Sequence, residues 1–238
     1  MTPSSALAST TARPVVVKLG GNALRSLPDA LAVAAAAPSP RPLVLVHGGG
    51  AQISDLMRRR GIEPRFVGGR RVTDLPVLAC VRMALAGVSD DLVDALREHG
   101  ANPAPLRRGE VIRGRRLDEL GLVGRVASVD TAPIEQAWAV GRVPLLAPLA
   151  LDEGGRFLNV NADDVAAAVA CALAAEELVF LSDVAGVLDA SGAVIPRIRA
   201  AAPPVVSGGM GPKLAASVQA VEAGVGRVRI GTGTTVTA

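Results

Sequence analysis

The sequence has 238 residues, which suits one large α/β unit or two lobes that share a sheet. Half of the residues are hydrophobic but only 2% are aromatic, so the core must consist mainly of Ala, Val and Leu. Charge is nearly balanced, with 25 Lys+Arg against 22 Asp+Glu, and rings for base stacking are scarce, so we expect no nucleic-acid partner. No apolar run reaches ~18 residues, so we expect no membrane partner either.

The N-terminal segment and the two cysteines bear on location. Residues 1–13 lack the basic start and the apolar block of a signal peptide, and we expect a disordered tail there. Cys80 and Cys171 lie among apolar residues without a CxxC partner, which predicts buried free thiols. Both features favour a cytoplasmic protein in a reducing compartment.

Short β-branched strands alternate along the chain with helices rich in Ala and Leu. This order predicts an α/β fold with a mostly parallel sheet and helices on both faces. The expected strands are Val15–Leu19, Leu43–His47, Val143–Ala147, Leu178–Leu181 and Arg227–Ile230. The expected helices are Ala23–Ala36, Gln52–Arg60, Leu75–Ala86, Ser89–His99, Pro133–Val140, Ala162–Ala174 and Lys213–Ala223.

Three further stretches predict hairpins because they are rich in Gly or Arg and have no helical period. They are Gly61–Thr73, Glu110–Ser128 and Leu149–Val160, the last with its turn at Gly154-Gly155. A boundary between lobes is expected near Ala147–Leu151. It gives an N-terminal lobe at 14–149 and a C-terminal lobe at 150–238, on one continuous sheet.

The first strand ends in a lysine followed by two glycines, in the sequence KLGG. Ligands of open parallel sheets bind at the carboxyl ends of the strands, which is where Lys18 lies. Gly20 and Gly21 let the backbone approach a ligand and turn into a helix, whose first N–H groups favour anions. The pattern is typical of a phosphate site with Lys18 as a point charge, although a lysine that merely ends a strand at the surface would read the same.

The second strand ends in a similar way, in the sequence HGGG. His47 is followed by Gly48, Gly49 and Gly50, and a helix comes next. The stretch is neither a P-loop nor a dinucleotide fingerprint. Its backbone amides fit an oxyanion or a carboxylate, while a flexible turn is the alternative. His47 is equally compatible with a structural and a functional role.

The sequence NVNADD places two amides and two carboxylates at a strand-to-helix junction. Asn159 and Asn161 lie two apart in an extended segment and therefore point to the same side, where they suit a polar substrate. We expect Asp163 or Asp164 to cap the helix that begins near Ala162. A carboxylate at Asp163 would also hold nearby ammonium groups in place.

Two motifs in the C-terminal part suit a nucleotide. In LSDVAGVLD, a strand ends at Ser182-Asp183 and Gly186 follows, a pattern that fits ribose or metal-bound water, or an ordinary Asx turn. In GGMGPK, glycines precede a helix that carries Lys213 near its start. The helix dipole disfavours a cation there, so an anion between Lys213 and the helix end would explain the lysine.

Taken in this order, KLGG, HGGG, RRVTD, NVNADD, LSDVAGVLD and GGMGPK resemble the amino acid kinase family from about Pro14 to the C-terminus. The resemblance implies a three-layer αβα sandwich and phosphoryl transfer from ATP to a carboxylate. NVNAD together with RVTD resembles the branch that phosphorylates the side-chain carboxylate of N-acetyl-L-glutamate, in arginine biosynthesis. A carboxylate is already a nucleophile, so this reaction needs positioning and positive charge rather than a general base.

The resemblance also implies roles for individual residues. Lys18 and Lys213 would neutralise the transferred phosphoryl group, and Asp163 would orient both lysines. The substrate would contact Gly49, Gly50, Arg71, Asn159 and Asn161, with Arg71 on its α-carboxylate. The nucleotide and its phosphates would contact Gly20, Gly21, Ser182, Asp183, Gly186, Leu188, Gly209 and Met210. Mg2+ would arrive on ATP, without a dedicated protein site.

The sequence departs from the family pattern in three places. Pro203-Pro204 exclude a regular helix before GGM, so the nucleotide lobe is expected to be trimmed. Gly211 stands where a bulkier apolar residue is usual, which would loosen the loop before Lys213. Arginine-inhibited members of the family resemble each other in having a long N-terminal helix. The segment before the first strand contains Pro3 and is too short for such a helix, so we expect a homodimer insensitive to arginine.

Other functions are also open on the sequence. A sister kinase that acts on glutamate or aminoadipate carried by an acidic protein would suit the Arg clusters. RRVTD and NVNAD argue against kinases for carbamate or nucleoside monophosphates. A non-catalytic binding module would keep the fold, but Lys18, Lys213 and Asp163 are all present. An oxidoreductase is disfavoured because GxGxxG is missing.

Overall fold

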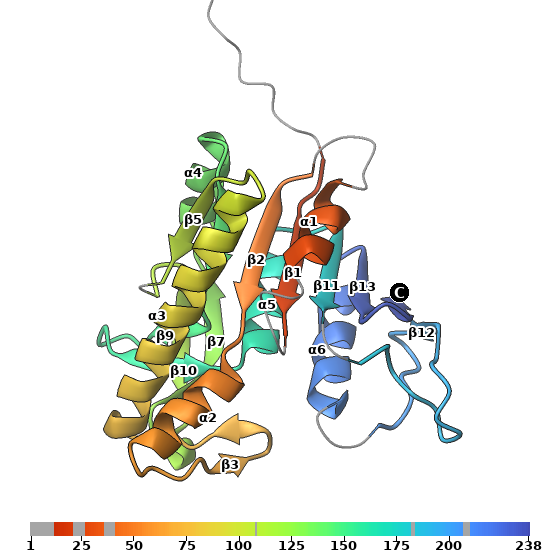
Figure 1. Ribbon diagram of the computed structural model, residues 1–238. Helices are drawn as coiled ribbons and strands as arrows, with labels where there is room; N and C mark the ends of the chain where they lie inside the picture. The colour runs from red at the N-terminus through yellow and green to blue at the C-terminus, as the bar shows by residue number, and fades with distance from the viewer. Residues whose placement is uncertain (1–11, 21–26, 36–40, 108, 182–183, 207–209) are drawn as a thin grey trace, which may run out of the picture.

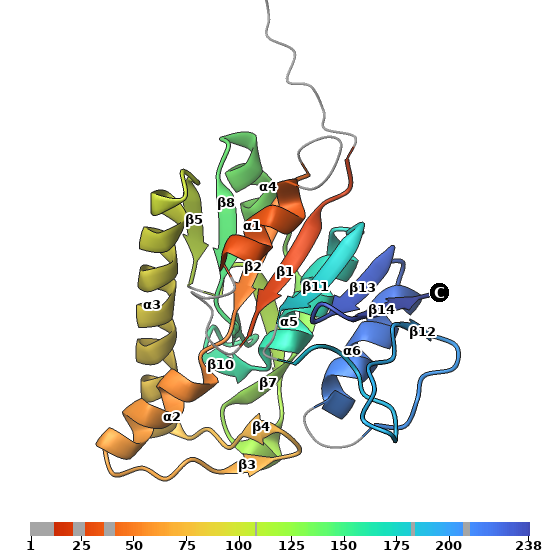
Figure 2. The ribbon, with the colours of Figure 1, turned by 45° about the vertical axis from the view of Figure 1, so that its right-hand side comes forward.

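The computed structural model describes residues 12–20, 27–35, 41–107, 109–181, 184–206 and 210–238. Its centre is an eight-stranded sheet in the order β12-β14-β13-β11-β1-β2-β8-β5 (Figure 2). All neighbouring strands are parallel except β13 and β14, so the predicted α/β fold with a mostly parallel sheet is confirmed. The strands are β1 Val15–Leu19, β2 Leu43–His47, β5 Pro103–Leu106, β8 Val143–Leu146, β11 Glu177–Leu181, β12 Arg197–Arg199, β13 Arg227–Ile230 and β14 Thr234–Thr237.

Helices cover both faces of this sheet, as the sequence predicts (Figure 1). One buried cluster joins β1, β2 and β11 to α1 and α3, and another joins the opposite faces of the same strands to α4, α5 and α6. The three layers of an αβα sandwich are therefore present. The helices are α1 Leu27–Ala35, α2 Gly50–Arg59, α3 Leu75–Glu98, α4 Ala132–Ala139, α5 Ala162–Ala172 and α6 Met210–Glu222, with a 3-10 turn at Asp118–Leu120.

Side-chain alternation along the strands decides which functional candidates can meet. On β1, Val16 packs against α5, and Lys18 follows on the same face two residues later. On β2, Leu45 packs beneath α3, and His47 follows on that opposite face. Lys18 and His47 lie at the same edge of the sheet but point to different layers, so they belong to different environments.

The remaining strands build two smaller structures beside the main sheet. β6 Ile112–Arg116, β7 Val123–Val129, β9 Leu149–Leu151 and β10 Phe157–Val160 form a closed barrel, and β3 Phe66–Val67 pairs with β4 Arg70–Arg71. The three predicted hairpins are confirmed, because β3–β4, β6–β7 and β9–β10 are all antiparallel pairs. The predicted lobe boundary at 149/150 falls within β9, and it stays a prediction.

The largest difference from the predicted elements is α3. Two helices were expected on either side of Gly87, but Leu75–Glu98 is one helix of 24 residues. Its buried stripe runs without interruption through Leu85, Val88 and Leu92, so packing against the sheet and α2 outweighs the cost of about 1 kcal/mol for an internal glycine. Tertiary burial thus overrides the local break signal.

Smaller differences concern strands at the sheet edges and one cysteine. β5, β12 and β14 were not predicted; β5 contains two prolines and the other two are short. Both cysteines are free, but Cys80 is buried whereas Cys171 is only half-buried. Among the described residues, no helix is long and apolar enough to cross a membrane. Residues 1–11 of the expected tail lie outside the described part of the chain.

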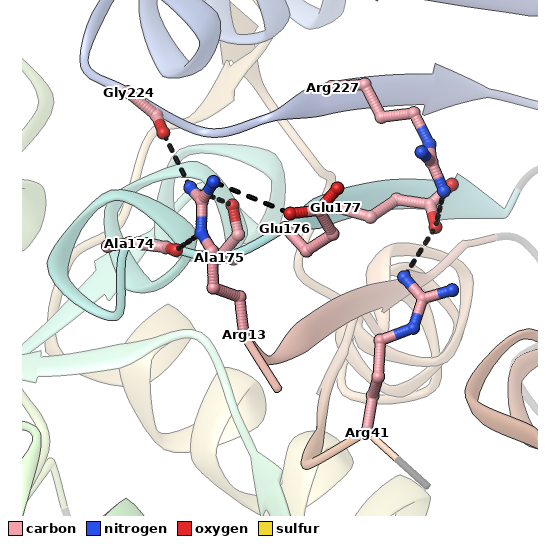
Figure 3. Close-up of polar contacts among 8 residues, drawn as sticks. All are labelled: Arg13, Arg41, Ala174, Ala175, Glu176, Glu177, Gly224 and Arg227. Carbon is pink, nitrogen blue, oxygen red and sulfur yellow. Dashed lines mark hydrogen bonds and ion pairs between the residues drawn. The ribbon is translucent and has the colours of Figure 1, made fainter. Parts of the chain in front are cut away.

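An ion cluster lies at the amino edge of the sheet, opposite the ends of β1 and β2 that carry Lys18 and His47 (Figure 3). The Glu177 carboxylate meets Arg41 at 3.7 Å, Arg227 at 3.0 Å and Arg229 at 2.6 Å, and we call this group the amino-edge cluster. Glu177 and Arg227 are direct partners in the β11–β13 register, so the sheet itself sets their proximity.

Beside that cluster, Arg13 binds the backbone just after the C-terminal ends of two neighbouring helices, α5 and α6 (Figure 3). Its guanidinium donates to the carbonyl oxygens of Ala174 at 2.7 Å, Ala175 at 3.0 Å and Gly224 at 2.9 Å. These carbonyls follow the last turns of α5 and α6, where no intrahelical N–H remains to satisfy them. Arg13 therefore ties the entry of β1 to the C-terminal ends of both helices.

Candidate active site

The carboxyl edge of the sheet brings together the three residues predicted to be catalytic. Asp163 lies between two ammonium groups, with its Oδ1 2.9 Å from Nζ of Lys18 and its Oδ2 2.7 Å from Nζ of Lys213. We call these three residues the catalytic-edge cluster. Lys18 comes from β1, Asp163 from the first turn of α5 and Lys213 from the first turn of α6. α5 and α6 pack against each other on the face to which Lys18 points.

Burial and charge shape the protonation of this cluster. Burial opposes the charge on Asp163, but attraction and hydrogen bonds from Lys18 and Lys213 outweigh it and lower the pKa of the carboxyl. Burial lowers the pKa of Lys213, repulsion from Lys18 lowers it further, and Asp163 opposes both. Nζ of Lys213 also lies 4.6 Å from the centre of the Phe180 ring, which stabilises the cation. Two cations share one anion, so the cluster carries a net positive charge.

Lys18 and Lys213 are the only lysines in the sequence, and all other basic residues apart from two histidines are arginines. Sequence reasoning overlooked this signal. All other cationic side chains apart from the histidines are guanidinium groups, whereas these two are compact ammonium groups. They are 195 residues apart in the sequence, and the fold brings both into contact with the carboxylate of Asp163.

A cavity of about 210 Å³ opens beside the catalytic-edge cluster. Its lining contains every predicted substrate contact and two of the predicted catalytic residues. These are Gly49, Gly50, Arg71, Asn159, Asn161, Lys18 and Asp163. Sequence reasoning did not assign several other lining residues to the site, among them Phe66 and Arg70 of the β3–β4 hairpin. Arg70 stands in the quoted motif RRVTD, so the signal was present but was attributed to its neighbour.

The two asparagines have different partners. Nδ2 of Asn159 donates to the hydroxyl of Thr73 at 3.1 Å, so its carbonyl oxygen remains for other contacts. Asn161 is the N-cap of α5, and its Oδ1 accepts from the backbone N–H of Asp163 at 2.7 Å and of Asp164 at 3.3 Å. The expectation that Asp163 or Asp164 caps this helix is therefore wrong. The cap one residue before the helix frees Asp163 to face the lysines.

Arg71 is more deeply engaged in the protein than the sequence predicts. The residue is 6% exposed, and its Nη2 donates to the carbonyl of Gly50 at 3.0 Å and to the hydroxyl of Ser54 at 2.9 Å. Its Nη1 lies 3.1 Å from the sulfur of Met57. Burial, with added repulsion from Arg58, lowers the pKa of the guanidinium. Arg71 thus joins β4 to α2 as well as lining the cavity.

Two of the glycines at the strand ends have structural roles. The N–H of Gly20 donates to the carbonyl of Leu181 at 2.9 Å and continues the ladder between β1 and β11. This N–H is thus already engaged in the sheet, and the predicted contact of Gly20 with the phosphates stays a prediction. Close packing explains why position 49 is a glycine, because a Cβ there would lie 2.8 Å from Cδ2 of Leu85 on α3. Gly50 opens α2, whose first N–H groups have no intrahelical carbonyl partner.

His47 is structural in this fold. Its Nδ1 donates to the carbonyl of Gly48 at 2.8 Å and its Nε2 accepts from the hydroxyl of Ser89 at 2.7 Å. The ring is fully buried, and this burial is the main cause that lowers its pKa to about 4. Neutral His47 therefore fastens the HGGG turn to α3 and does not line the cavity beside Lys18.

A second, larger cavity of about 770 Å³ lies at the predicted nucleotide segments. Gly186, Leu188 and Met210 line it, together with Ile195 and Pro204–Val206. Residues 201–206 contain no helix, as predicted from the two prolines, and Pro204–Val206 form a wall of this cavity. Most of the lining is apolar, which suits a flat base. The predicted contacts Gly21, Ser182, Asp183 and Gly209 lie outside the described residues.

Two residues of this region have a structural explanation. A Cβ on Gly186 would collide with the hydroxyl of Thr234, so this glycine is required by close packing whether or not it meets a ligand. Oδ1 of Asp189 accepts from the hydroxyl of Ser191 at 2.7 Å and from the N–H groups of Ser191 and Ala193 at 2.8 and 3.0 Å, and these hydrogen bonds lower the pKa of an exposed carboxyl. No group of three or more His, Cys, Asp or Glu side chains within the described ranges could hold a metal ion.

The chain belongs to the amino acid kinase family, whose family model matches residues 13–232. It is 42% identical to the acetylglutamate kinase of Methanopyrus kandleri over 230 residues, which cover 88% of this chain and 91% of the relative. It is 40% identical to the acetylglutamate kinase of Koribacter versatilis over 232 residues, which cover 91% of this chain and 89% of the relative. The resemblance drawn from the motifs is confirmed.

Solved structures share the fold. The smu.665 protein of Streptococcus mutans UA159 superimposes with a TM-score of 0.83 at 33% identity, covering 94% of this chain and 98% of that one. Carbamate kinase from Giardia lamblia, solved with AMP-PNP, gives a TM-score of 0.68 at 15% identity over 95% of this chain and 99% of that one. The second likeness concerns the fold alone.

Proposed function

We propose that this protein transfers a phosphoryl group from ATP to the side-chain carboxylate of N-acetyl-L-glutamate. The product is N-acetyl-L-glutamyl 5-phosphate, an intermediate of arginine biosynthesis. The two relatives near 40% identity support the substrate. The observation that supports the reaction is the bridge from Lys18 through Asp163 to Lys213. Lys18 and Asp163 line the smaller cavity, and α6, which carries Lys213, begins at the wall of the larger one.

The arrangement suits the joining of two anions. The carboxylate of the substrate attacks phosphorus directly, so no side chain has to remove a proton. Lys18 and Lys213 offset the charge on the transferred phosphoryl group, and Asp163 prevents the two ammonium groups from separating. The first turn of α6 adds backbone N–H groups and the positive end of its dipole on the same side as Lys213. Substrate positioning falls to Asn159 and to the amides before α2.

ATP use follows from membership of the family. The larger cavity fits the group, because apolar residues such as Leu188 and Ile195 suit an adenine ring and α6, which carries Lys213, begins at its wall. We propose that Mg2+ is held mainly by the phosphates of ATP, as is usual where a protein offers few carboxylates. The free thiols of Cys80 and Cys171 fit a reducing compartment, so the cytoplasm is the proposed location.

The test is an ATP-dependent hydroxamate assay, which traps acyl phosphates. It compares N-acetylglutamate, glutamate and no acceptor, using wild type, Lys213→Ala and the exposed-arginine control Arg197→Ala. We expect hydroxamate from N-acetylglutamate alone, about 10²- to 10³-fold slower with Lys213→Ala and unchanged with Arg197→Ala. Absence of product from either free acid with wild type would overturn the proposed substrate and favour a carrier-linked one.

A further inference from the structure

One side of the larger cavity is formed by residues 184–195, which supply most of its lining and which we call the cavity segment. The segment folds back on itself as an irregular antiparallel hairpin. Leu188 pairs with Val194 in this hairpin. The N–H of Asp189 donates to the carbonyl of Ala193 at 2.8 Å. The shape of this side of the cavity therefore depends on how the two arms of the hairpin are held together.

One rung of the hairpin is completed by a residue from outside the cavity segment. The N–H of Ile195 donates to the carbonyl of Val187 at 2.8 Å, and in a regular antiparallel pair the N–H of Val187 would donate back to Ile195. The hydroxyl of Thr234 on β14 takes up this second bond instead. It accepts from the N–H of Val187 at 2.9 Å and donates to the carbonyl of Ile195 at 2.8 Å. Thr234 thus relays the bond between the two arms through its side chain.

Burial makes this relay costly to lose. Thr234 is 2% exposed and Val187 is fully buried, so water has little access to replace the hydroxyl. Without it, the N–H of Val187 and the carbonyl of Ile195 would both lose a hydrogen-bond partner. Thr234 does not line the cavity, so any influence on a ligand must pass through the two arms.

The turn between β13 and β14 brings Thr234 close to the cavity segment. The N–H of Gly233 donates to the carbonyl of Ala185 at 2.7 Å, and a Cβ on Gly233 would lie 2.8 Å from Cγ1 of Val194. Gly231 has a φ of 60°, and a Cβ there would lie 2.6 Å from the carbonyl oxygen of Ala185. The turn therefore contacts both arms of the hairpin, and the hydroxyl of Thr234 joins them.

We propose that Thr234 is a positioning residue for ATP, because its hydroxyl sets the spacing of the two arms that form one side of the nucleotide cavity. The inference rests on the proposed function in taking the larger cavity as the nucleotide site. Without the hydroxyl, the arms satisfy the N–H of Val187 and the carbonyl of Ile195 in another arrangement. ATP must then restore the binding arrangement at a cost, which weakens its affinity by about 10-fold.

The experiment measures ATP binding by calorimetry with Mg2+ and without an acceptor, and separately KM for ATP and for N-acetylglutamate in the hydroxamate assay. The proteins are wild type, Thr234→Val, Thr234→Ser and Thr235→Val. Thr234→Val keeps the size and the β-branch but removes the hydroxyl, whereas Thr234→Ser retains the hydroxyl. Thr235 is the next residue of β14, is more exposed and points to the opposite face of the sheet, so Thr235→Val is the matched control.

We expect Thr234→Val to raise both the Kd and the KM for ATP by about 10-fold. The kcat and the KM for N-acetylglutamate should stay within about two-fold of wild type, because the hydroxyl acts on the nucleotide side alone. Thr234→Ser and Thr235→Val are expected to keep wild-type affinity for ATP.

The inference is overturned if Thr234→Val binds ATP as tightly as wild type, or if Thr234→Ser loses as much affinity as Thr234→Val. It is also overturned if KM for ATP and KM for N-acetylglutamate rise by the same factor, because that result marks a general loss of structure. If Thr234→Val does not fold, Thr234→Cys replaces it under the same criteria, since a thiol is a weak donor and acceptor. Failure of the proposed function looks different, because wild type would then bind ATP but make no product from N-acetylglutamate.

Discussion

Two ion clusters lie at opposite edges of the same sheet, and each contains one carboxylate between several cations. In the catalytic-edge cluster, Asp163 meets two lysines at 2.9 and 2.7 Å. In the amino-edge cluster, Glu177 meets three arginines at 2.6 to 3.7 Å, and Figure 3 shows two of them, Arg41 and Arg227. The choice of cation differs completely between them, although the chain has only two lysines to distribute.

The difference separates a site that must accept a further anion from a site that must only hold the chain together. A guanidinium binds a carboxylate through several directed donors, which suits a fixed junction between β11, β13 and the start of β2. An ammonium is a compact charge that keeps its attraction for a second anion while it contacts the first. Asp163 lines a cavity together with Lys18, whereas the side chain of Glu177 is only 3% exposed beneath its arginines.

Of the substitutions that test the difference between the two clusters, Asp163→Asn is expected to have the largest effect. The change leaves Lys18 and Lys213 without an anion between them, so repulsion separates the ammonium groups. We expect turnover to fall about 10²- to 10³-fold, by analogy with the loss of one transition-state donor. Hydroxamate kinetics measure the change, and urea unfolding checks that the fold is kept. Turnover within a few-fold of wild type would show that Asp163 does not orient the lysines.

The same substitution also has a pH signature. The folded-state pKa of Asp163 lies below its unfolded value, so its contribution to stability is present above the unfolded value and is lost as pH falls through the folded one. Wild type is therefore expected to lose unfolding free energy in acid more steeply than Asp163→Asn.

Replacing Glu177 with Gln breaks the other cluster and should change stability without changing chemistry. The substitution leaves Arg41, Arg227 and Arg229 facing a neutral amide. We expect the free energy of unfolding to fall by about 3 kcal/mol, since a buried carboxylate that pairs several cations is lost. The kcat of the folded enzyme should remain that of wild type. Urea unfolding and hydroxamate kinetics measure the two quantities.

Glu176→Gln is the matched control for this prediction. Its side chain is 38% exposed and reaches Arg13 only at 3.5 Å, so we expect a loss below about 1 kcal/mol. Equal losses for the two variants would contradict the assignment of the amino-edge cluster as a stability device.

The buried His47 adds a third contribution to stability, which depends on pH and is lost only in acid. Its folded pKa is about 4 against an ordinary value of 6.5, so the unfolded chain binds a proton over this range and the folded protein does not. Stability is therefore lost as pH falls from 6.5 toward 4, by about 3 kcal/mol in total. We expect His47→Gln to flatten this part of the unfolding profile, measured with urea at several pH values.

The second histidine provides the control. His99 is exposed at the end of α3, and its substitution with Gln should leave the wild-type slope in place. A profile that His47→Gln does not alter would mean that the ring is not the group that titrates.

Much of this protein was readable from local patterns. The strands β1, β2 and β13 begin and end at the expected residues, because a β-branched run followed by glycine encodes both an extended backbone and its end. The order of the glycine-rich turns identified the family and located Lys18, Asp163 and Lys213. These features depend on neighbours within a few positions along the chain, which a sequence displays directly.

Other features were decided by the tertiary structure. Sequence periodicity places Lys18 and His47 at one edge, but only the packed helices show that one faces α5 and the other α3. The ion pair between Arg70 and Asp164 joins residues that are 94 positions apart in the sequence. The ion pair between Lys213 and Asp163 joins residues that are 50 positions apart. Such contacts depend on how strands are ordered in the sheet, so no local pattern contains them.

The sequence by itself thus determined the class of fold, the family and the three charged residues at the catalytic edge, because short-range periodicity and turn chemistry specify them. The tertiary structure alone decided that Asn161 caps α5, that the N–H of Gly20 belongs to the sheet, and that α3 passes through Gly87 unbroken. In each case a distant partner or a buried surface outweighed a local preference, because burial and hydrogen bonding act on the folded arrangement rather than on the order of residues.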